Sequence, residues 1–462
     1  MSCEMTWSST RYSPAVSAKE SIYIKQIIPC IDSIYIAFSS DEDKNTVFFR
    51  KKDSENEWRE LECGCSCVTI PSLEEGCEYE FYIASDSFES ELGYARAGYV
   101  PGTVVNYLHP DDKKYSFSGA HLCSPSLLIH PDGYLLASMD LYGRNTPQNL
   151  TLIFRSDDRG ESWYHYCELF PCFWGTLFYH KGHVYMLSVS TEHGDILIGR
   201  SDDGGKSFGT PTVLARGSCR TEVAGWHKGA MPITEHEGRL WIGVDWGAHK
   251  AGGYASSLLS ADAESDLLCQ SSWTLTPPLC FDPSWKGAVA GDARGFLEGN
   301  AVVSPDGEIL NILRYSTDKG EPNCCLAGVL SGDKTSPERQ LRFKAFVSFP
   351  GNLSKFDIKR DKRTGYYFTI LSRIHDKTKP RTRNLLSLAA SCDLENWTVL
   401  LDLIDYRDSD DQLVGFQYVS FDFDGDDILY LCRTAFNGAK SYHDNNYVTF
   451  HTIKDFRSLI GK

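Results

Sequence analysis

Three arginines occupy matching places in a pattern that repeats along the chain. Arg314, Arg373 and Arg433 each follow the second apolar run of a repeat unit. Guanidinium groups fit carboxylates in both charge and shape, so arginines from separate units that meet at one place would bind an anion. The whole chain has a formal net charge of −16, so such a cationic site would be a local feature. We therefore predict a binding site for an acidic ligand.

Four residues at comparable places could move protons or serve as other catalytic groups. His227 and Lys228 lie in the glycine-flanked segment GWHKGA, which favours an exposed turn over a packed core. Glu298, in FLEGN, comes before a strongly apolar strand, where an isolated carboxylate is either a site residue or a buried ion-pair partner. Tyr418 comes before the first strand of the last unit. We predict that these four residues are catalytic.

The predicted substrate-binding set combines cationic, amide and acidic side chains from several units. Its members are Arg314, Arg373, Arg433, Lys355, Asn300, Gln417, Asp245, Arg144 and His443. The loops also offer Arg383 and Asp444. Each arginine taken singly could instead pair with a neighbouring acid, and His443 could form a hydrogen-bonded pair with Asp444.

Six copies of one four-stranded unit are expected to position these residues. Each copy begins with an apolar strand, a tight polar turn and a second strand, and the six turns read HPDG, HKGH, HEGR, SPDG, KRTG and FDGD. Asp and Gly in such turns suit tight hairpins. Repeated units of four strands are typical of a β-propeller. Residues before each first strand and after each second strand then share one face, which selects the candidates above.

A second motif recurs at matching places of the units. Residues 156–163, SDDRGESW, follow the pattern S-x-D-x-G-x-[ST]-W. Residues 201–208 repeat it with Phe in place of Trp, and residues 391–397 form a degraded third copy. We expect the Asp to cap the turn and the aromatic residue to pack between strands, so these turns stabilise blades and do no catalysis.

The chain before the repeats is predicted to form a separate small domain. Several short alternating strands between residues 19 and 98 suggest a β-sandwich. The stretch IPSLEEGCEYEFYIAS, with Leu73, Gly76 and Tyr79, resembles the tyrosine-corner region of fibronectin type III domains. The predicted divisions are an N-terminal tail at 1–18, the sandwich at 19–98, a linker at 99–114 and the catalytic propeller at 115–462.

Residues 115–455 resemble the sialidase superfamily in their six-fold unit and in the turn motif, which is called an Asp-box there. The resemblance implies an all-β fold, a six-bladed sialidase-like β-propeller preceded by a small β-sandwich. In sialidases an Arg at the first strand holds the sialic acid carboxylate, and a later loop carries the acid/base Asp. Here Cys123 stands in place of that Arg, and the loop DLYGRNTPQNL keeps Arg144 but lacks the Asp. Segments such as GWHKGAMPI and FLEGNAVVSPDG are more similar to α-L-rhamnosidases and rhamnose–glucuronate lyases.

We predict a carbohydrate-active enzyme that cleaves a terminal glycosidic bond next to an acidic sugar, a uronate, in an oligosaccharide. We place β-elimination ahead of hydrolysis, because the cations could neutralise the uronate carboxylate while His227 or Tyr418 moves protons. Hydrolysis needs two facing carboxyl groups, which Glu298, Asp245 and Asp140 could supply. The alternatives are an exo-α-sialidase-type hydrolase and a non-catalytic glycan-binding propeller.

Composition excludes several other classes of function. The chain has no basic cluster to follow nucleic acid and no apolar run long enough to span a membrane. Its first residues lack a secretory signal and its 16 cysteines are scattered, so we expect reduced thiols and a cytoplasmic location. The cysteine spacing does not match a zinc site, and we expect neither a metal nor a cofactor. A homo-oligomer is compatible with the sequence.

Overall fold

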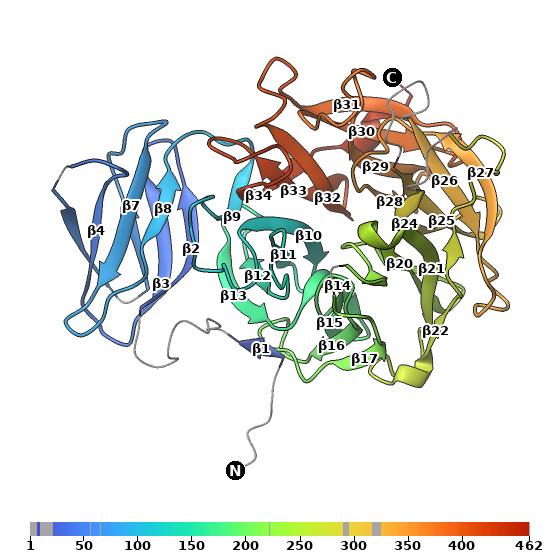
Figure 1. Cartoon of the computed structure of the whole chain (residues 1–462), viewed down its shortest axis with the longest axis horizontal. Coiled ribbons are helices and arrows are strands. Elements are labelled where there is room, and N and C mark those ends of the chain that lie inside the picture. Colours follow the sequence, from blue (N-terminus) through green and yellow to red (C-terminus); the bar gives the residue numbers. More distant parts are fainter. Residues whose placement is uncertain are drawn as a thin grey trace, which may run out of the picture.

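The protein is all-β in the computed structural model, which describes residues 7–9, 22–55, 57–64, 66–220, 222–289, 295–316 and 325–461. Six antiparallel sheets surround a common centre as the blades of a propeller, and a small β-sandwich lies beside them (Figure 1). The predicted fold class is therefore confirmed.

Blades 1 to 3 are formed by consecutive segments of the chain. Blade 1 consists of β10 (His121–Ile129), β11 (Leu135–Tyr142), β12 (Thr151–Ser156) and β13 (Tyr164–Leu169). Blade 2 consists of β14 (Phe173–His180), β15 (His183–Val189), β16 (Ile196–Ser201) and β17 (Thr212–Ala215). In blade 3 the innermost strand is split in two, and the strands are β18 (Gly225–His227), β19 (Thr234–His236), β20 (Arg239–Ala248), β21 (Gly253–Asp262), β22 (Trp273–Leu275) and β23 (Leu279–Cys280).

Blades 4 to 6 complete the ring. Blade 4 consists of β24 (Phe296–Val303), β25 (Ile309–Tyr315), β26 (Leu326–Ser331) and β27 (Arg342–Ser348). Blade 5 consists of β28 (Asp357–Arg360), β29 (Tyr367–Ser372), β30 (Leu385–Ser391) and β31 (Thr398–Asp405). Blade 6 consists of β32 (Gly415–Asp424), β33 (Asp427–Ala435), β34 (Tyr447–Ile453) and β9 (Thr103–Tyr107). Short 3₁₀ turns lie at His249–Ala251, Gln270–Ser272 and Phe456–Leu459.

Burial decreases from the innermost strand of a blade to its outermost strand. In β10 and β24 almost every residue is buried, because neighbouring blades cover both faces of these strands. In β31, exposed and half-buried residues dominate. Figure 1 shows β10, β14, β24 and β32 nearest the centre of the ring. The innermost strands are therefore the elements that bring residues of different blades together.

Two segments predicted to lie outside the propeller contribute strands to it. β9 belongs to the predicted linker, residues 99–114, yet it pairs with β34 through Tyr107 opposite Tyr447. This pairing joins the start of the propeller to its last blade and so closes the ring. β1 (Ser8–Ser9), from the predicted tail at 1–18, pairs with β13. Beside β1, the buried Trp7 donates a hydrogen bond from Nε1 to the carbonyl oxygen of Pro171 at 2.9 Å.

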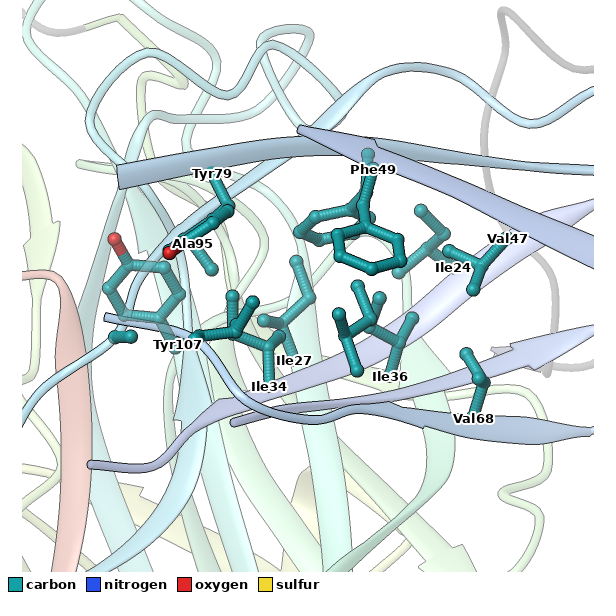
Figure 2. Packing of buried hydrophobic residues seen from close by; sticks show 14 of the residues in the cluster. Ile24, Ile27, Ile34, Ile36, Val47, Phe49, Val68, Tyr79, Ala95 and Tyr107 are labelled. Carbon is teal, nitrogen blue, oxygen red and sulfur yellow. The ribbon is translucent and has the colours of Figure 1, made fainter. Parts of the chain in front are cut away.

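The sandwich packs a three-stranded sheet against a four-stranded one. The first sheet contains β2 (Tyr23–Pro29), β3 (Ile34–Ser39) and β6 (Cys67–Ile70), and the second contains β5 (Arg59–Cys63), β4 (Asn45–Lys51), β7 (Glu78–Ala84) and β8 (Gly93–Arg96). Alternate residues of each strand point inward, and Figure 2 shows Ile34 and Ile36 facing Val47 and Phe49 across the core. The predicted sandwich strands are present, and β8 adds one more.

Tyr79, near the start of β7, is arranged like a tyrosine corner. Its hydroxyl accepts a hydrogen bond from the backbone N–H of Glu74, five residues upstream, at 2.9 Å. This bond back to the preceding turn is the feature that defines such a corner. The assignment to the fibronectin type III class remains a prediction.

The sandwich contacts the propeller through buried polar groups as well as apolar ones. Gln26 in β2 donates from Nε2 to the carbonyl oxygens of Val105 at 2.7 Å and Trp163 at 3.0 Å. Tyr23 donates to Oε1 of the buried Glu168 in β13 at 2.5 Å. The sandwich is thereby joined to the first and last blades, next to the strand that closes the ring.

The three predicted Asp-containing turns share one hydrogen-bond pattern. Asp158 and Asp203 each accept a backbone N–H from the serine four residues later, at 2.9 and 2.8 Å. Asp393 accepts the backbone N–H of Asn396 at 2.8 Å. The aromatic residues of the first two turns, Trp163 and Phe208, are buried. Each Asp therefore caps its turn, as the sequence predicts.

Candidate functional site

Four innermost strands carry the same local irregularity at the same place. Ser124, Trp174, Glu298 and Tyr418 each have a positive φ, between 45° and 56°, beside a β-bulge in β10, β14, β24 and β32. A bulge redirects side chains, and a non-glycine residue with positive φ is strained, a combination that is frequent at functional sites. The sequence predicts these residues before the first strands, but the structure places them within the strands.

Glu298 and Tyr418 come from blades 4 and 6 and meet at the centre. The hydroxyl of Tyr418 donates a hydrogen bond to Oε1 of Glu298 at 2.9 Å. Arg314, in β25, donates from Nη1 to Oε2 of Glu298 at 2.8 Å and to the Tyr418 oxygen at 3.1 Å. Glu298 is only 2% exposed. Three predicted site residues that are distant in sequence therefore form one hydrogen-bonded group.

The surroundings set different proton affinities for Glu298 and Tyr418. Burial alone would raise the pKa of Glu298, but the charges of Arg314 and His227 and the hydrogen bonds it accepts hold it below its ordinary value. Burial and the negative charge of Glu298 raise the pKa of Tyr418. At neutral pH the glutamate is thus a carboxylate and the tyrosine is a neutral phenol. Glu298 is placed to accept the proton of Tyr418.

Two further arginines flank the ring of Tyr418. The guanidinium carbon of Arg433 lies 5.0 Å from the ring centroid and that of Arg383 lies 5.8 Å from it. Gln417 accepts a hydrogen bond from Arg383, and Asn445 and the carbonyl oxygen of His443 accept hydrogen bonds from Arg433. Neutral groups therefore hold both arginines in place.

The three arginines leave an excess of positive charge around Tyr418. Within the described ranges, neither Arg383 nor Arg433 forms an ion pair with a carboxylate, and only Arg314 is paired with Glu298. Burial, together with the charges of Arg314 and Arg433, lowers the pKa of Arg383 to about 10. The Nε atoms of Arg314 and Arg383 are buried and have no hydrogen-bond acceptor among the described residues. Buried guanidinium groups with free donors are chemically suited to bind an anion.

His227 lies beside this group between two aromatic rings. Its ring centroid is 4.1 Å from that of Trp174 and 4.9 Å from that of Tyr254. Its Nδ1 is 3.5 Å from Oδ2 of Asp245, a fully buried carboxylate in β20. The same oxygen accepts the backbone N–H of Glu298 at 2.8 Å. Asp245 therefore holds the strained Glu298 by a hydrogen bond and lies within ion-pair distance of His227.

The two predicted site lysines are structural. Lys228 is fully buried and donates to the carbonyl oxygens of Trp174 and Gly229 and to the hydroxyl of Thr176, at 2.7 to 3.2 Å. These three acceptors match the three protons of an ammonium group. Lys355 donates to Asp357 at 2.5 Å and to the carbonyl oxygen of Val419 at 3.0 Å. Both lysines join neighbouring blades, so the predicted roles in catalysis and substrate binding are not supported by their contacts.

Arg373 and Asn300 are also engaged elsewhere. Arg373 pairs with Asp402 of the outermost strand β31 at 3.1 Å, which directs it toward the rim of blade 5. Arg383 of the same blade, and not Arg373, lies beside Tyr418, so the predicted role of Arg373 in substrate binding is not supported by its contacts. Asn300 links blades 4 and 5, because it donates to the carbonyl oxygen of Phe356 and accepts the N–H of Ile358.

His443 and Arg144 lie near Tyr142, at the edge of the site. The His443 ring centroid is 5.5 Å from that of Tyr142, and its Nδ1 is 2.8 Å from Asp444. Burial and the charge of Arg433 lower the pKa of His443 to about 4, so its ring is neutral at neutral pH. Arg144 is exposed. Tyr254, which packs on His227, was not predicted from the sequence, because it lies at the start of β21, the third strand of a blade, and not at the end of a first or second strand or in the loop that follows.

Among the described residues, no group of three or more His, Cys, Asp or Glu side chains is arranged to hold a metal ion. The described part of the chain also contains no helix with the length and apolar character needed to cross a membrane.

Comparisons with known proteins bear on the fold. No family model matches the sequence, and no curated protein matches it. A mutant α-L-arabinofuranosidase from Fusarium graminearum, bound to an iminosugar inhibitor, aligns with a TM-score of 0.50 at 13% identity, over 76% of this chain and 97% of its own. An α-L-arabinanase from Penicillium chrysogenum has a TM-score of 0.48 at 13% identity, over 77% and 98% of the two chains. A leech intramolecular trans-sialidase has a TM-score of 0.49 at 10% identity, over 96% and 93%. At such identities the likeness concerns the fold alone.

Proposed function

We propose that this protein is a glycoside hydrolase that cleaves a terminal glycosidic bond of an acidic sugar, with Tyr418 as the nucleophile and Glu298 as its base. One observation carries the proposal: a tyrosine hydroxyl is hydrogen-bonded to a buried carboxylate and surrounded by three arginines. Tyrosine serves as the nucleophile in sialidases, where most other glycosidases use a carboxylate.

The charge of the substrate explains why a tyrosine suits this position. A carboxylate nucleophile would be repelled by the carboxylate of an acidic sugar, whereas a neutral phenol is not. As the Tyr418 oxygen attacks the anomeric carbon, its proton passes to Glu298, and the bond to the leaving oxygen breaks with protonation of that oxygen. Water then cleaves the tyrosyl–sugar bond, and Glu298 returns the proton to Tyr418. The sugar keeps its anomeric configuration through the two displacements.

The position of the arginines favours one class of acidic sugar. Arg314, Arg383 and Arg433 surround the nucleophile itself, so the carboxylate they bind would lie next to the anomeric carbon. Sugars that carry the carboxylate on that carbon, such as sialic acids, fit this arrangement best. Uronates, in which the ring oxygen separates the two carbons, are the second choice. Hydrolysis now stands ahead of elimination, because the phenol–carboxylate pair is suited to nucleophilic attack.

A substrate panel tests this proposal. Purified protein would be assayed with aryl glycosides of sialic acid, glucuronic acid and arabinofuranose, and with uronate-containing oligosaccharides. We expect release of an acidic sugar without a new double bond. Accumulation of an unsaturated uronate, detected by ultraviolet absorbance, would establish elimination instead. Binding of acidic glycans with no turnover of any substrate would indicate a glycan-binding propeller and refute the proposal.

We also propose that the sandwich is a fibronectin type III-like domain. Its division into three and four strands and the bond from the Glu74 N–H to the Tyr79 hydroxyl support this assignment.

A further inference from the structure

The proposed reaction needs an acid that protonates the leaving oxygen. Neither Tyr418 nor Glu298 can serve, because both act at the anomeric carbon. The blade 1 loop at residues 143–150, GRNTPQNL, carries no carboxylate. His227 remains a candidate from the sequence, but its ring is enclosed by Trp174 and Tyr254. A carboxyl group from another loop on the same side of the propeller would have to supply the proton.

We propose that Glu192 is the catalytic acid of this site; the proposal rests on the proposed function. Glu192 lies in the loop between β15 and β16 of blade 2 and is half-buried. Its Oε2 accepts a hydrogen bond from Nε2 of Gln148 at 2.6 Å. Gln148 belongs to the carboxylate-free loop of blade 1, so blade 2 supplies a carboxyl group where the blade 1 loop offers an amide.

The Gln148 amide is built to hold this carboxyl group. Gln148 is 1% exposed and has a strained backbone, with φ at 51°, which its N–H maintains by donating to the carbonyl oxygen of Ser118 at 2.8 Å. Its own Oε1 is buried without a donor among the described residues. An amide can turn to present this oxygen, so Gln148 can bond Glu192 in both its ionised and its protonated form.

A chain of contacts connects the Glu192 loop to Glu298. The Tyr254 ring centroid is 4.9 Å from that of His227, and Nδ1 of His227 is 3.5 Å from the Asp245 oxygen that accepts the N–H of Glu298. Burial is the main cause of the raised pKa of Tyr254, and the charges of Glu192, Asp245, Glu298 and Tyr418 add to it. The charge of His227 acts on both Glu192 and Glu298. The next residue, His193, anchors the loop because its Nε2 lies 3.2 Å from the Tyr254 hydroxyl.

Burial of Glu192 favours its protonated form. The positive charge of His227 acts on Glu192. The negative charge of Glu192 acts in turn on Tyr254, Tyr142 and Cys123. The neighbouring His193 faces the Tyr254 hydroxyl. Burial raises the pKa of Glu192, and the hydrogen bond from Gln148 and the charge of His227 only partly oppose this. Glu298 is shifted in the opposite direction. Two carboxyl groups with diverging pKa values suit an acid and a base in one reaction.

The proton balance of the reaction is complete with these residues. Glu192 gives its proton to the leaving oxygen as the glycosidic bond breaks and Tyr418 bonds to the sugar. The resulting Glu192 carboxylate then takes a proton from the water that attacks the tyrosyl–sugar bond. The departing Tyr418 oxygen recovers its proton from Glu298, and the site returns to its starting state.

The test compares leaving groups in a Glu192→Gln variant of the full chain. A general acid contributes about 10²- to 10⁴-fold, so kcat/KM for a natural or alkyl glycoside should fall by that factor. With a dinitrophenyl leaving group, which departs without protonation, the fall should be less than about tenfold. The loss of rate on the alkaline side of the wild-type pH profile, where Glu192 ionises, should also disappear. Equal losses for both substrates, or an unchanged alkaline limb, would overturn the assignment of Glu192.

A second variant keeps the proposal testable without removing the carboxyl group. Gln148→Leu deletes a donor that favours ionised Glu192, so the alkaline limb should move to higher pH. An unmoved limb would contradict the proposal. Glu161→Gln, in an exposed turn far from Glu192 along blade 1, is the matched control. The two proposals can fail separately. If Glu192→Gln lowers kcat/KM equally for the alkyl and the dinitrophenyl glycoside while Tyr418→Phe is inactive toward both, the inference on Glu192 fails and the proposed function stands.

Discussion

Glu298 and Tyr418 adopt left-handed backbone conformations, with φ of 56° and 52°. Such conformations cost roughly 1–3 kcal/mol each in non-glycine residues. Asp245 holds one of them by accepting the N–H of Glu298. The strained conformations serve the chemistry of the site, because the two bulges direct the side chains of Glu298 and Tyr418 into one hydrogen-bonded group. Packing alone would be served by ordinary strand geometry.

The lowered pKa of Glu298 leads to a first prediction, on the pH dependence of kcat/KM. Its pKa is held below the ordinary value, so the carboxylate persists into acid and is lost only as pH falls through that lowered pKa. We expect wild-type kcat/KM to decrease on this acidic side. Glu298→Gln should lower kcat/KM by about 10²- to 10⁴-fold and flatten the acidic limb. If the Glu298→Gln variant kept both the wild-type kcat/KM and the wild-type decrease at acidic pH, Glu298 would not be the base.

The two arginines of blade 5 provide a second prediction. Arg383 flanks Tyr418, whereas Arg373 pairs with Asp402 at the rim. Arg383→Lys should lower kcat/KM for an acidic substrate by about 10- to 100-fold, because lysine cannot reproduce the planar fork. Arg373→Lys is the matched control and should leave the kinetics unchanged. Steady-state kinetics on both variants checks this, and an equal effect of the two would contradict the anion site.

At the scale of the elements, buried carboxyl and ammonium groups connect neighbouring blades beneath the site. Asp140 accepts the N–H of Trp174 in the next blade, as Asp245 does for Glu298. Lys355 reaches from blade 5 to the carbonyl oxygen of Val419 in blade 6. These contacts fix the innermost strands against each other, so the geometry of the site depends on pairs that never touch the ligand.

The Lys355–Asp357 pair offers a stability prediction. The side chains of both residues are almost fully buried and are 2.5 Å apart. Lys355→Met leaves a buried carboxylate without its partner and should destabilise the protein by about 3–5 kcal/mol. The double variant Lys355→Met with Asp357→Leu should recover much of this loss, because no charge is then left alone. Denaturant unfolding measures both, and a double variant no better than the single one would argue against the pair.

At the scale of the whole molecule, closure of the ring depends on β9. This strand precedes the six blades in sequence and completes the last of them. It also carries Val104 and Tyr107 in the sandwich core. The small domain and the propeller closure are thus joined in one strand.

Interrupting β9 should therefore loosen the last blade. Asn106→Pro removes a backbone N–H from the middle of the strand, where Asn106 is opposite Val448. We expect faster hydrogen exchange of the β34 amides and a melting temperature several degrees lower than that of the matched control Asn106→Ala. Equal protection of β34 in the two variants would show that closure does not depend on β9.

The sequence predicted the fold and four central residues of the candidate site, because the repeat unit shows which positions of different blades are equivalent. The repeat unit aligns Glu298, Tyr418, Arg314 and Arg433 by position, and the structure brings these four together. Position alone could not separate Arg373 from Arg383, because the path of their shared loop depends on contacts with Leu353 and Gln417. Nor could it find β9, whose partner lies more than 300 residues away along the chain. The glycines around Lys228 predicted an exposed turn. In the structure Gly225 is packed tightly against the backbone of His193, and Gly229 has a positive φ of 60°, so neither glycine marks exposure.

The most direct test of the account is covalent trapping. A fluorinated glycosyl fluoride of the accepted acidic sugar would be incubated with the protein, and the labelled peptide would be identified by mass spectrometry after digestion. The account predicts a single sugar adduct on the Tyr418 side chain, absent from Tyr418→Phe. An adduct on Glu298, or rapid turnover with an inverted product and no adduct, would contradict it.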